Sequence, residues 1–359
     1  MSDAAAIKPV LIMAGGTGGH IFPGLAVADE LRKRRTPVVW VGGRGGLEQH
    51  IVPQHGLRLE TLPIAGVRGK GILAKLFAPL TLLIAIIAAG GVLRRHAPRS
   101  VLSMGGYAAA PGGIAAWIAR VPVIVHEQNR IPGMTSRLLA RFAKRVLTGF
   151  ADAFPQGEWV GNPVRASISA LPAPAARYAG RDGPLKLLVL GGSQGAQSLN
   201  VALPEMLRRR GARFAIEVRH QCGAKHFEQA RNAYMRAGVE ASVVPFEEDM
   251  AAAYAWADLV ICRSGALTLA ELAAAGVPAI LVPYPHAVDD HQTKNAEAMV
   301  AAGGARLVAE GDDFVKRLGA AFVEIGDRAK LAEMAEAART LAKPFAGKEI
   351  AEACLEVAA

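Results

Sequence analysis

The stretch Met13-Ala-Gly-Gly-Thr-Gly-Gly-His-Ile-Phe-Pro-Gly24 follows the apolar residues 10–12 and precedes a helical pattern at residues 25–31. This order predicts a strand, a glycine turn and a helix, the arrangement in which parallel α/β sheets present backbone N–H groups to phosphate. Glycine lets the main chain approach an anion closely and take a positive φ. His20, in the same turn, can exchange a proton near neutral pH. The turn therefore predicts diphosphate binding combined with proton transfer.

Two well-known phosphate-binding motifs do not fit this turn. A dinucleotide fingerprint starting at Gly16 and Gly18 would need glycine or alanine where Ile21 stands. It would also need an acidic residue about twenty positions further on, and residues 38–43 contain none. A Walker motif is excluded as well, because no Gly-Lys-Ser/Thr follows the glycines.

The composition is that of a folded protein with room for two domains. The chain has 359 residues, of which 52% are apolar and 20% charged, and this excludes a disordered protein. Its three cysteines, Cys222, Cys262 and Cys354, form no C-x-x-C pair, as expected for a reduced cytosolic protein. Residues 1–8 have an early acid and no sustained apolar core, so we expect no secretory signal.

A formal net charge of +10 indicates an anionic partner: nucleic acid, an acidic membrane surface or a phosphorylated substrate. The basic clusters, such as residues 32–35 and 137–145, do not alternate with the aromatic side chains that a single-strand binder stacks on bases. Aromatic residues make up only 6% of the chain. We therefore expect no nucleic-acid partner.

Residues 76–93 carry no charged side chain and are flanked by lysine and arginine on both sides. Their length reaches the lower limit for crossing a bilayer. Pro79, Thr81 and Gly90-Gly91 weaken this as a membrane helix, and a true span would interrupt the first predicted sheet. Two alternatives remain open, a wholly buried crossover helix and a helix whose exposed side enters the lipid interface. The interfacial interpretation predicts a peripheral protein on an anionic membrane surface.

Apolar runs recur along the chain in two series. The first comprises residues 10–13, 37–41, 57–62, 101–103, 121–125 and 145–147, and the second comprises residues 186–190, 214–218, 241–244, 259–262, 279–282 and 306–308. Because the runs are continuous rather than alternating, they are typical of parallel strands buried on both faces. The sequence therefore predicts an α/β fold class with two consecutive Rossmann-like, doubly wound parallel-sheet domains.

A turn-rich stretch from Gly161 to Pro184 separates the two series. We place the domains at residues 1–164 and 165–342. Lys343-Pro344 interrupts the final helical pattern, so residues 343–359 are expected to form a C-terminal helix that returns to the first domain. Further glycine turns at residues 191–195 and 105–106 follow apolar strands, and together the three turns predict a phosphate-rich ligand between the domains.

Several motifs resemble the MurG family of peptidoglycan N-acetylglucosaminyltransferases, in that family's order and over most of the chain. The motifs are Gly15-Gly-Thr-Gly-Gly-His20, Gly105-Gly-Tyr107, His126-Glu-Gln-Asn129, Gly161-Asn-Pro-Val-Arg165, Gly191-Gly-Ser-Gln-Gly195, Arg263-Ser-Gly-Ala-Leu-Thr268 with Glu271, and Asp290-His-Gln292 with Asn295. The resemblance implies the GT-B fold, with two domains facing across a cleft. It also implies inverting transfer of GlcNAc from UDP-GlcNAc to the 4-hydroxyl of MurNAc in undecaprenyl-pyrophosphoryl-MurNAc-pentapeptide, which converts lipid I to lipid II.

The resemblance assigns the acceptor and the membrane to the N-terminal domain and UDP-GlcNAc chiefly to the C-terminal domain. The expected UDP-GlcNAc-binding residues are Thr17, Gly18, Gly19, Asn129, Arg165, Ser193, Glu247, Arg263, Ala266, Leu267, Thr268, Leu269, Ala270, Glu271 and Gln292. The expected contacts of the acceptor pyrophosphate are Gly15, Gly16, Gly105, Gly106 and Tyr107. Glu271 resembles the carboxylate that accepts hydrogen bonds from the ribose hydroxyls.

Independent of the resemblance, Arg263 and the small residues after it precede a helical pattern, so a guanidinium and free helix N–H groups can face a diphosphate leaving group. Such a site needs no metal ion, and no Asp-x-Asp stands at a strand end, so we expect neither metal nor cofactor. His20 is the candidate general base, with Glu127 as the alternative base or as the group that orients His20. His20 could instead only cap the loop or contact pyrophosphate.

Two residues depart from the family pattern. Glu247 stands where an apolar residue is common beside uracil, and Ser136 replaces a common asparagine. If main-chain N–H and C=O groups read the base, the first change matters little. If a side chain reads it, we expect nucleotide selectivity to differ from that of the family.

The expected partners are UDP-GlcNAc, lipid I, an anionic membrane surface and other cell-wall and division proteins. The expected location is peripheral, on the cytoplasmic face of the bacterial inner membrane. Two other functions remain open: a UDP-GlcNAc 2-epimerase of the same fold, and a non-catalytic subunit that binds a nucleotide sugar or a membrane.

Overall fold

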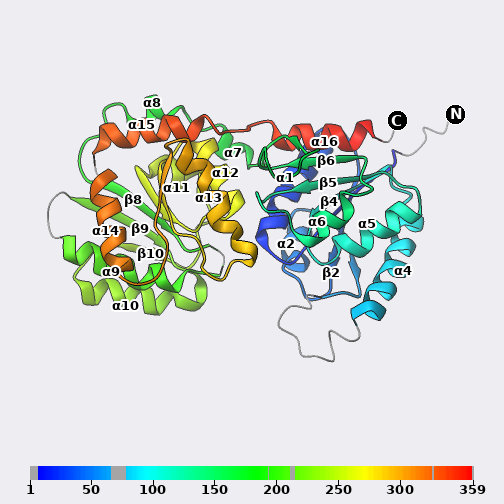
Figure 1. The fold of residues 1–359 in the computed structure, drawn as a ribbon, viewed down its shortest axis with the longest axis horizontal. Coiled ribbons are helices and arrows are strands. Elements are labelled where there is room, and N and C mark those ends of the chain that lie inside the picture. Colours follow the sequence, from blue (N-terminus) through cyan, green and yellow to red (C-terminus); the bar gives the residue numbers. More distant parts are fainter. Residues whose placement is uncertain (1–6, 66–77, 193, 211–214, 326, 358–359) are drawn as a thin grey trace. The chain divides into compact units, whose positions relative to one another are not determined.

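A computed structural model describes residues 7–65, 78–192, 194–210, 215–325 and 327–357 (Figure 1). The chain divides into two compact units. The first unit comprises Met1–Pro163 together with Lys343–Ala359, and the second comprises Val164–Ala342. These divisions lie within one residue of the predicted boundaries at 164/165 and 342/343.

The first unit contains a seven-stranded sheet, in the order β3-β2-β1-β4-β5-β6-β7, whose described pairings are all parallel. Its strands are β1 (Val10–Ala14), β2 (Val38–Gly43), β3 (Arg58–Leu62), β4 (Ser100–Gly105), β5 (Val123–Glu127), β6 (Arg145–Thr148) and β7 (Glu158–Trp159). Its helices are α1 (Gly18–Lys33), α2 (Glu48–Gln54), α4 (Ala78–His96), α5 (Ala109–Ile118), α6 (Met134–Leu139) and α16 (Ala346–Glu356). Six of the strands coincide with predicted apolar runs, whereas the two-residue β7 was not predicted.

Both faces of this sheet are covered, which explains the continuous apolar character of its strands. On one face Val10 and Ile12 of β1 pack in a core cluster with residues of α1 and α16. On the other face Leu11 and Met13 pack with residues of α4 and α5. Alternate residues of the central strand thus point into two different cores. The unit is doubly wound, as predicted.

The predicted apolar segment at 76–93 is helical over its described part, α4. The helix buries Ala85, Ala89, Val92 and Leu93 against the sheet side of the unit. It leaves four larger apolar side chains exposed: Leu80, Leu83, Ile84 and Ile87. By length and composition α4 could cross a membrane. Only 22% of its most apolar window is buried, whereas the core helix of a soluble protein is mostly buried. The wholly buried alternative is therefore wrong, because α4 has one packed side and one bare side.

The second unit contains a six-stranded sheet in the order β10-β9-β8-β11-β12-β13, again with parallel pairings throughout its described part. The strands are β8 (Leu185–Leu190), β9 (Ile216–Gln221), β10 (Ser242–Val244), β11 (Leu259–Cys262), β12 (Ala279–Leu281) and β13 (Ala305–Leu307). The helices are α7 (Ala166–Ser169), α8 (Pro174–Tyr178), α9 (Gln197–Arg210), α10 (Phe227–Ala237), α11 (Met250–Trp256), α12 (Ala266–Ala275), α13 (His291–Ala301), α14 (Phe314–Ile325) and α15 (Arg328–Arg339), with short 3-10 turns η1 (Ala224–His226) and η2 (Val288–Asp290). All six strands overlap the second predicted series.

The C-terminal helix α16 packs against α1 in the first unit (Figure 1). Ile350, Ala351, Ala353 and Cys354 are fully buried there and belong to the same core cluster as β1. The hydroxyl of Ser100, at the start of β4, donates to the carbonyl of Cys354 over 2.7 Å. Helix α16 is thus an integral part of a unit that is otherwise made from the first 163 residues.

Candidate functional site

The glycine turn between β1 and α1 is held in place by a buried carboxylate. Gly16 has φ +91°, a conformation that favours glycine. Its N–H donates to Glu48 Oε2 over 3.0 Å, and the N–H of Gly43 donates to Glu48 Oε1 over 2.9 Å. Helix α1 begins at Gly18, so the first amides of the helix have no acceptor within it. The turn therefore offers backbone donors from a fixed position.

His20 is half-buried on this turn, with its ring against Gly105, where a Cβ would lie 2.8 Å from His20 Cδ2. Nδ1 lies 3.4 Å from the hydroxyl oxygen of Thr17. Burial lowers the pKa of His20, opposed by the negative charges of Glu127 and Glu48 and by hydrogen bonding to the backbone of Gly15. The lowered pKa favours a neutral imidazole near pH 7, the form that can accept a proton.

Glu127, at the end of β5, organises the turn that follows it. Its Oε1 accepts hydrogen bonds from the backbone and side-chain amides of Asn129, over 2.9 and 3.2 Å. Its Oε2 accepts from the backbone N–H of Gly133 over 3.0 Å. The carboxylate is buried and acts electrostatically on His20. This arrangement suits a group that orients its surroundings.

His126 has a different environment from His20. Its Nε2 donates to the carbonyl of Gly161 over 2.9 Å, so Nδ1 is the acceptor for the side-chain amide of Gln128, 3.0 Å away. The side-chain amide of Asn162 donates to the carbonyl of Gln128. This is a second hydrogen bond between the motif at residues 126–129 and the motif at residues 161–165. Burial lowers the pKa of His126 to about 4. His126 is therefore a neutral structural residue, and both its ring nitrogens have partners.

The third glycine turn, after β4, lies against the first. Gly105 and Gly106 have φ values of +98° and +89°, and a Cβ on Gly106 would overlap the carbonyl of Gly15. A Cβ on Gly16 would lie 3.1 Å from the ring of Tyr107, whose side chain is exposed. The five residues expected at the acceptor pyrophosphate, Gly15, Gly16, Gly105, Gly106 and Tyr107, are therefore neighbours in the first unit.

In the second unit, Glu271 on α12 is oriented by two donors. Its Oε1 accepts from Arg165 Nη2 over 3.0 Å, and its Oε2 accepts from the hydroxyl of Tyr254 over 3.1 Å. Burial, with Glu271 nearby, holds the pKa of Tyr254 well above its ordinary value, so this hydroxyl keeps its proton. The Glu271 side chain is 17% exposed, which excludes a freely solvated helix acid.

Arg263 follows β11 and its guanidinium has several protein partners. It donates to the carbonyls of Val282 and Pro283 and to the hydroxyl of Ser198. It also forms an ion pair with Glu310, beyond β13. Arg263 therefore joins the ends of neighbouring strands, and its pairing with Glu310 was not predicted from the sequence.

The start of α12 combines free helix amides with small residues. Gly265 caps the helix without a side-chain hydrogen bond, so the first amides, from Ala266 to Thr268, have no acceptor within the helix. Leu269 and Ala270 follow in the first turns. The Ser264 hydroxyl is buried, and no described residue is its hydrogen-bond partner. Such a helix start can bind an anion.

The remaining expected donor residues lie on separate loops. Gln292 Oε1, in α13, accepts from the backbone N–H of Tyr284 over 2.9 Å. Glu247 is half-buried beside the exposed Phe246 after β10. Ser193 lies outside the described residues. Ser136, the other departure from the family pattern, is buried in α6.

The glycine turn after β8 is held by Gln221, a residue not singled out in the sequence. Gln221 Oε1 accepts from the N–H of Gly192, and its Nε2 donates to the carbonyls of Gly192 and Pro245. In both units a buried polar side chain thus fixes a glycine turn through main-chain hydrogen bonds. The only sequence signal for Glu48 was its place two residues after the glycine-rich residues 42–46.

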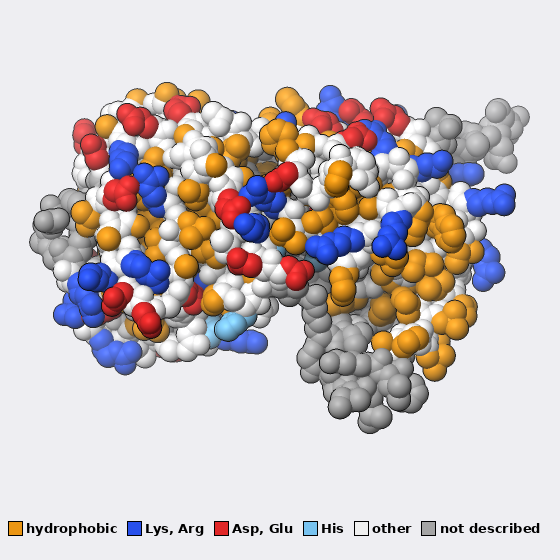
Figure 2. Space-filling model, viewed as in Figure 1, with side chains coloured by type: hydrophobic (Ala, Val, Ile, Leu, Met, Phe, Trp, Pro, Cys, Tyr) orange, Lys and Arg blue, Asp and Glu red, His pale blue; other side chains and the backbone are white. Residues whose placement is uncertain are grey.

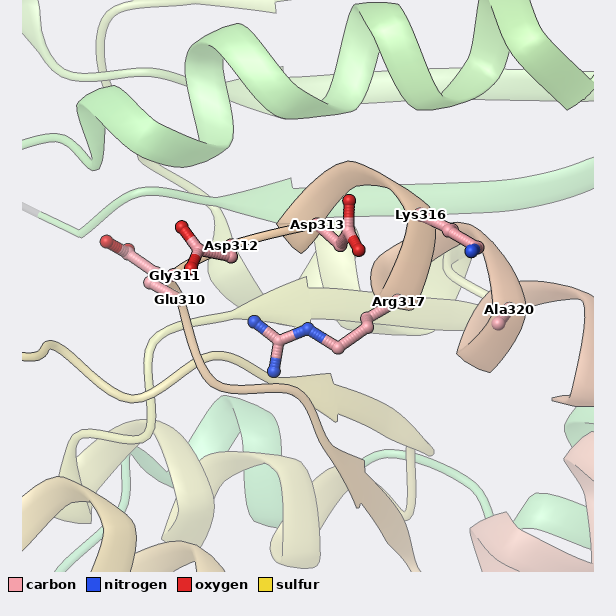
Figure 3. A pocket seen from close by; sticks show the side chains of 7 residues that line it. All are labelled: Glu310, Gly311, Asp312, Asp313, Lys316, Arg317 and Ala320. Atoms are coloured by element: carbon pink, nitrogen blue, oxygen red, sulfur yellow. The ribbon is translucent and has the colours of Figure 1, made fainter.

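Within the described ranges, no group of three or more His, Cys, Asp or Glu side chains could hold a metal ion. An open depression lies elsewhere, beside the start of α14, and Figure 3 shows acidic and basic side chains around it, including Glu310, Asp313 and Arg317. None of its lining residues was an expected site residue. Glu310 connects it to the expected donor site through its ion pair with Arg263 and through the hydroxyl of Ser198.

Comparisons with known proteins place this geometry in a family. The glycosyltransferase family 28 N-terminal domain matches residues 10–148 and the C-terminal domain of the same family matches residues 186–352. A relative from Xylella fastidiosa, named UDP-N-acetylglucosamine--N-acetylmuramyl-(pentapeptide) pyrophosphoryl-undecaprenol N-acetylglucosamine transferase, is 58% identical over 97% of this chain and 96% of its own. The chain belongs to the MurG family of glycosyltransferase family 28.

A solved structure of MurG from Acinetobacter baumannii has a TM-score of 0.84, with 38% sequence identity over 97% of this chain and 99% of that chain. The GT-B fold expected from the motifs is thereby confirmed. UDP-GlcNAc 2-epimerase from Neisseria meningitidis has a TM-score of 0.65 over 98% of this chain and all of its own. At 14% identity that likeness shows the fold alone.

The buried His126 predicts a pH-dependent stability. Its pKa in the folded protein, about 4, lies below the ordinary value of 6.5, so the unfolded chain binds more protons between these pH values. The stability contribution is full above pH 6.5 and is lost as the pH falls toward 4. From pH 7 to pH 5, the free energy of unfolding should fall by about 2 kcal/mol more in wild type than in a folded His126→Gln variant. Urea unfolding at both pH values measures this, and equal falls in the two proteins would contradict it.

Proposed function

We propose that this protein transfers GlcNAc from UDP-GlcNAc to the 4-hydroxyl of the MurNAc unit of lipid I, forming lipid II. The hydroxyl oxygen attacks the anomeric carbon of GlcNAc from the face opposite the leaving group. The bond from that carbon to the β-phosphate oxygen breaks, and UDP departs with the electron pair. The acceptor proton passes to a base on the protein, and the anomeric centre inverts.

The observation that supports this function most is the 58% identity over 97% of the chain to a relative named for this transfer. The donor that the name states contains a nucleoside diphosphate, and the acceptor contains a pyrophosphate. Glycine turns follow β1, β4 and β8, and α12 begins with free amides. Helix starts and glycine turns of this kind bind phosphate groups through backbone N–H donors.

His20 is the proposed base. It lies in the turn that carries the expected pyrophosphate contacts, and its lowered pKa favours the neutral form. Both carboxylate oxygens of Glu127 already accept hydrogen bonds from the turn at residues 129–133. Glu127 is therefore proposed to orient this region and to stabilise His20 once it has gained a proton, rather than to act as the base.

The second unit is proposed to hold the donor. A carboxylate has about four lone-pair sites, so Glu271 can accept the ribose hydroxyls while Arg165 and Tyr254 orient it. Residues 266–270, at the start of α12, are proposed to bind the diphosphate. Ser193 and Arg263 are proposed to contribute to the same phosphate contacts. Arg263 would then exchange part of its contact with Glu310 for phosphate. Thr17, Gly18, Gly19, Asn129, Glu247 and Gln292 complete the proposed donor contacts.

We propose that this transfer needs no metal or cofactor. The charge that develops on departing UDP would be stabilised by the amides of α12 and by guanidinium groups. Gly15, Gly16, Gly105, Gly106 and Tyr107 would bind the acceptor pyrophosphate in the same manner.

The transfer is tested with purified protein, labelled UDP-GlcNAc and a short-chain analogue of lipid I. We expect a β-1,4-linked disaccharide on the lipid, and release of UDP only when the acceptor is present. Turnover of UDP-GlcNAc without acceptor would indicate an epimerase or a hydrolase. Binding of both substrates without any turnover would indicate a non-catalytic subunit.

Two variants separate the proposed roles. His20→Ala should lower kcat by about 100-fold or more with little change in the KM for UDP-GlcNAc, because a general base acts in the transition state. Glu271→Ala should raise that KM by roughly tenfold to a hundredfold, because hydrogen bonds to a charged group are lost. Exposed counterparts, His55→Ala and Glu333→Ala, serve as controls. Wild-type kcat in His20→Ala would remove His20 from the mechanism.

The protein is further proposed to bind the cytoplasmic face of the inner membrane peripherally, through its first unit. Helix α4 packs against α5, and Trp117 and Ile118 at the end of α5 are exposed like the bare side of α4. Figure 2 shows apolar side chains gathered over these two helices. Arg94 and Arg95 are basic residues in the last turn of α4, and Arg95 forms an ion pair with Glu60. An apolar surface with basic neighbours suits the interface of an anionic bilayer.

Vesicle binding tests this surface. Leu83→Ser combined with Ile87→Ser should weaken binding to anionic vesicles by about 2 kcal/mol, roughly thirtyfold, because both half-exposed side chains lose apolar contact with lipid. Val201→Ser with Met235→Ser, two exposed apolar residues of the second unit, is the matched control. High salt should release only part of the wild-type protein. Equal binding of both double variants would contradict the assignment.

A further inference from the structure

Glu48 is a fully buried acid that no motif of the family resemblance included. It begins α2, directly after the loop that leaves β2. Among the described residues it forms no ion pair. Burying a carboxylate without a cation is unfavourable unless hydrogen bonds compensate. Its compensation comes from the backbone N–H groups of Gly16 and Gly43, at 3.0 and 2.9 Å.

The main chain around this carboxylate is glycine on three sides. A Cβ on Gly15, Gly42 or Gly46 would overlap the Glu48 side chain. These glycines come from the loop before α1, the end of β2 and the loop before α2. The carboxylate thus occupies the space that side chains would fill, and its hydrogen bonds join two of these segments, the loop before α1 and the end of β2. Charge-assisted hydrogen bonds of this kind are stronger than those between neutral groups.

The same carboxylate acts on His20, four residues after Gly16. The groups that face His20 are Glu127 from β5, Glu48 from α2, and the backbone of Gly15 in its own turn. Each of them raises the pKa of His20, against the larger lowering by burial. Glu48 therefore contributes both to the position of the turn and to the charge beside the proposed base.

We propose that Glu48 is a positioning residue of the transfer reaction: its buried carboxylate fixes the Gly15–Gly19 turn through Gly16 and holds negative charge beside His20. The inference rests on the proposed function, because it assigns Glu48 a role in the reaction of that site. Glu48 does not touch the substrates. It keeps the turn amides in place for the acceptor pyrophosphate and stabilises His20 when the acceptor proton arrives.

Two variants separate geometry from charge. Glu48→Gln keeps the size, but it removes the charge and turns an amide donor toward one of the two N–H groups. We expect kcat to fall by about tenfold or more, the KM for UDP-GlcNAc to stay within about twofold, and the acid limb of the kcat profile to move to lower pH. Glu48→Asp keeps the charge but is too short to reach both amides. It should lower kcat without moving the acid limb.

Glu349→Gln, on the exposed side of α16, is the control for net charge in the same unit and should leave kcat and the pH profile unchanged. A merely structural role for Glu48 would lower thermal stability and leave the acid limb in place. Wild-type kcat in either Glu48 variant, or an unmoved acid limb in Glu48→Gln, would overturn the proposal. If Glu48→Gln did not fold, the kcat of Glu48→Asp would still test the proposal: a lowered kcat would support it and a wild-type kcat would overturn it.

Titration of His20 by NMR, assigned with His20→Ala, gives a second readout that needs no transfer. The pKa of His20 should be lower in Glu48→Gln than in wild type, because a negative charge has been removed. If wild-type protein bound both substrates but formed no disaccharide, the proposed function would fail, while a lowered His20 pKa would still support the placement of Glu48. An unchanged His20 pKa would overturn the role of Glu48 and leave the transfer assay unaffected.

Discussion

Main-chain groups just beyond the carboxyl ends of parallel strands have no neighbouring strand to bond with, and buried ones must find another partner. In this protein polar side chains meet that requirement. Glu48 and Glu127 accept from loop N–H groups in the first unit. Gln221 and Arg263 bond to loop carbonyls or amides in the second. The loops that carry the expected site residues are therefore held in shape before any ligand arrives, which lowers the cost of binding.

The two histidines of the first unit show how environment separates structural from chemical roles. Burial lowers the pKa of both. His126 has a carbonyl partner at one ring nitrogen and an amide partner at the other, so a proton could be added only by breaking that network. His20 is partly exposed, its Nδ1 lies 3.4 Å from the Thr17 hydroxyl, and the carboxylates of Glu127 and Glu48 both act on it. The charges of both carboxylates offset part of the effect of burial at His20, whereas at His126 the hydrogen bonds at both ring nitrogens oppose protonation.

The apolar runs predicted both sheets, because strands buried on two faces must be continuously apolar. The strand β7 escaped prediction, since two exposed residues carry no such pattern. Site residues in glycine-rich motifs were identifiable because few residue types fit those turns. The partners of those residues were not: Glu48 bonds to main-chain N–H groups, which have no sequence signature. Arg263 meets Glu310 only because the ends of β11 and β13 lie at the same edge of one sheet. The bare side of α4 could not be told from a buried one by composition alone.

The position of α16 has a consequence for biosynthesis. Ile350, Ala351 and Cys354 fill part of the core beneath β1, yet a ribosome makes them only after all of the second unit. The second unit is continuous in sequence and can complete its core while translation proceeds. The first, although it begins earlier, exposes an unfilled apolar face until α16 emerges. During that interval the exposed apolar face makes the nascent chain prone to aggregation, and this face is where a chaperone would bind.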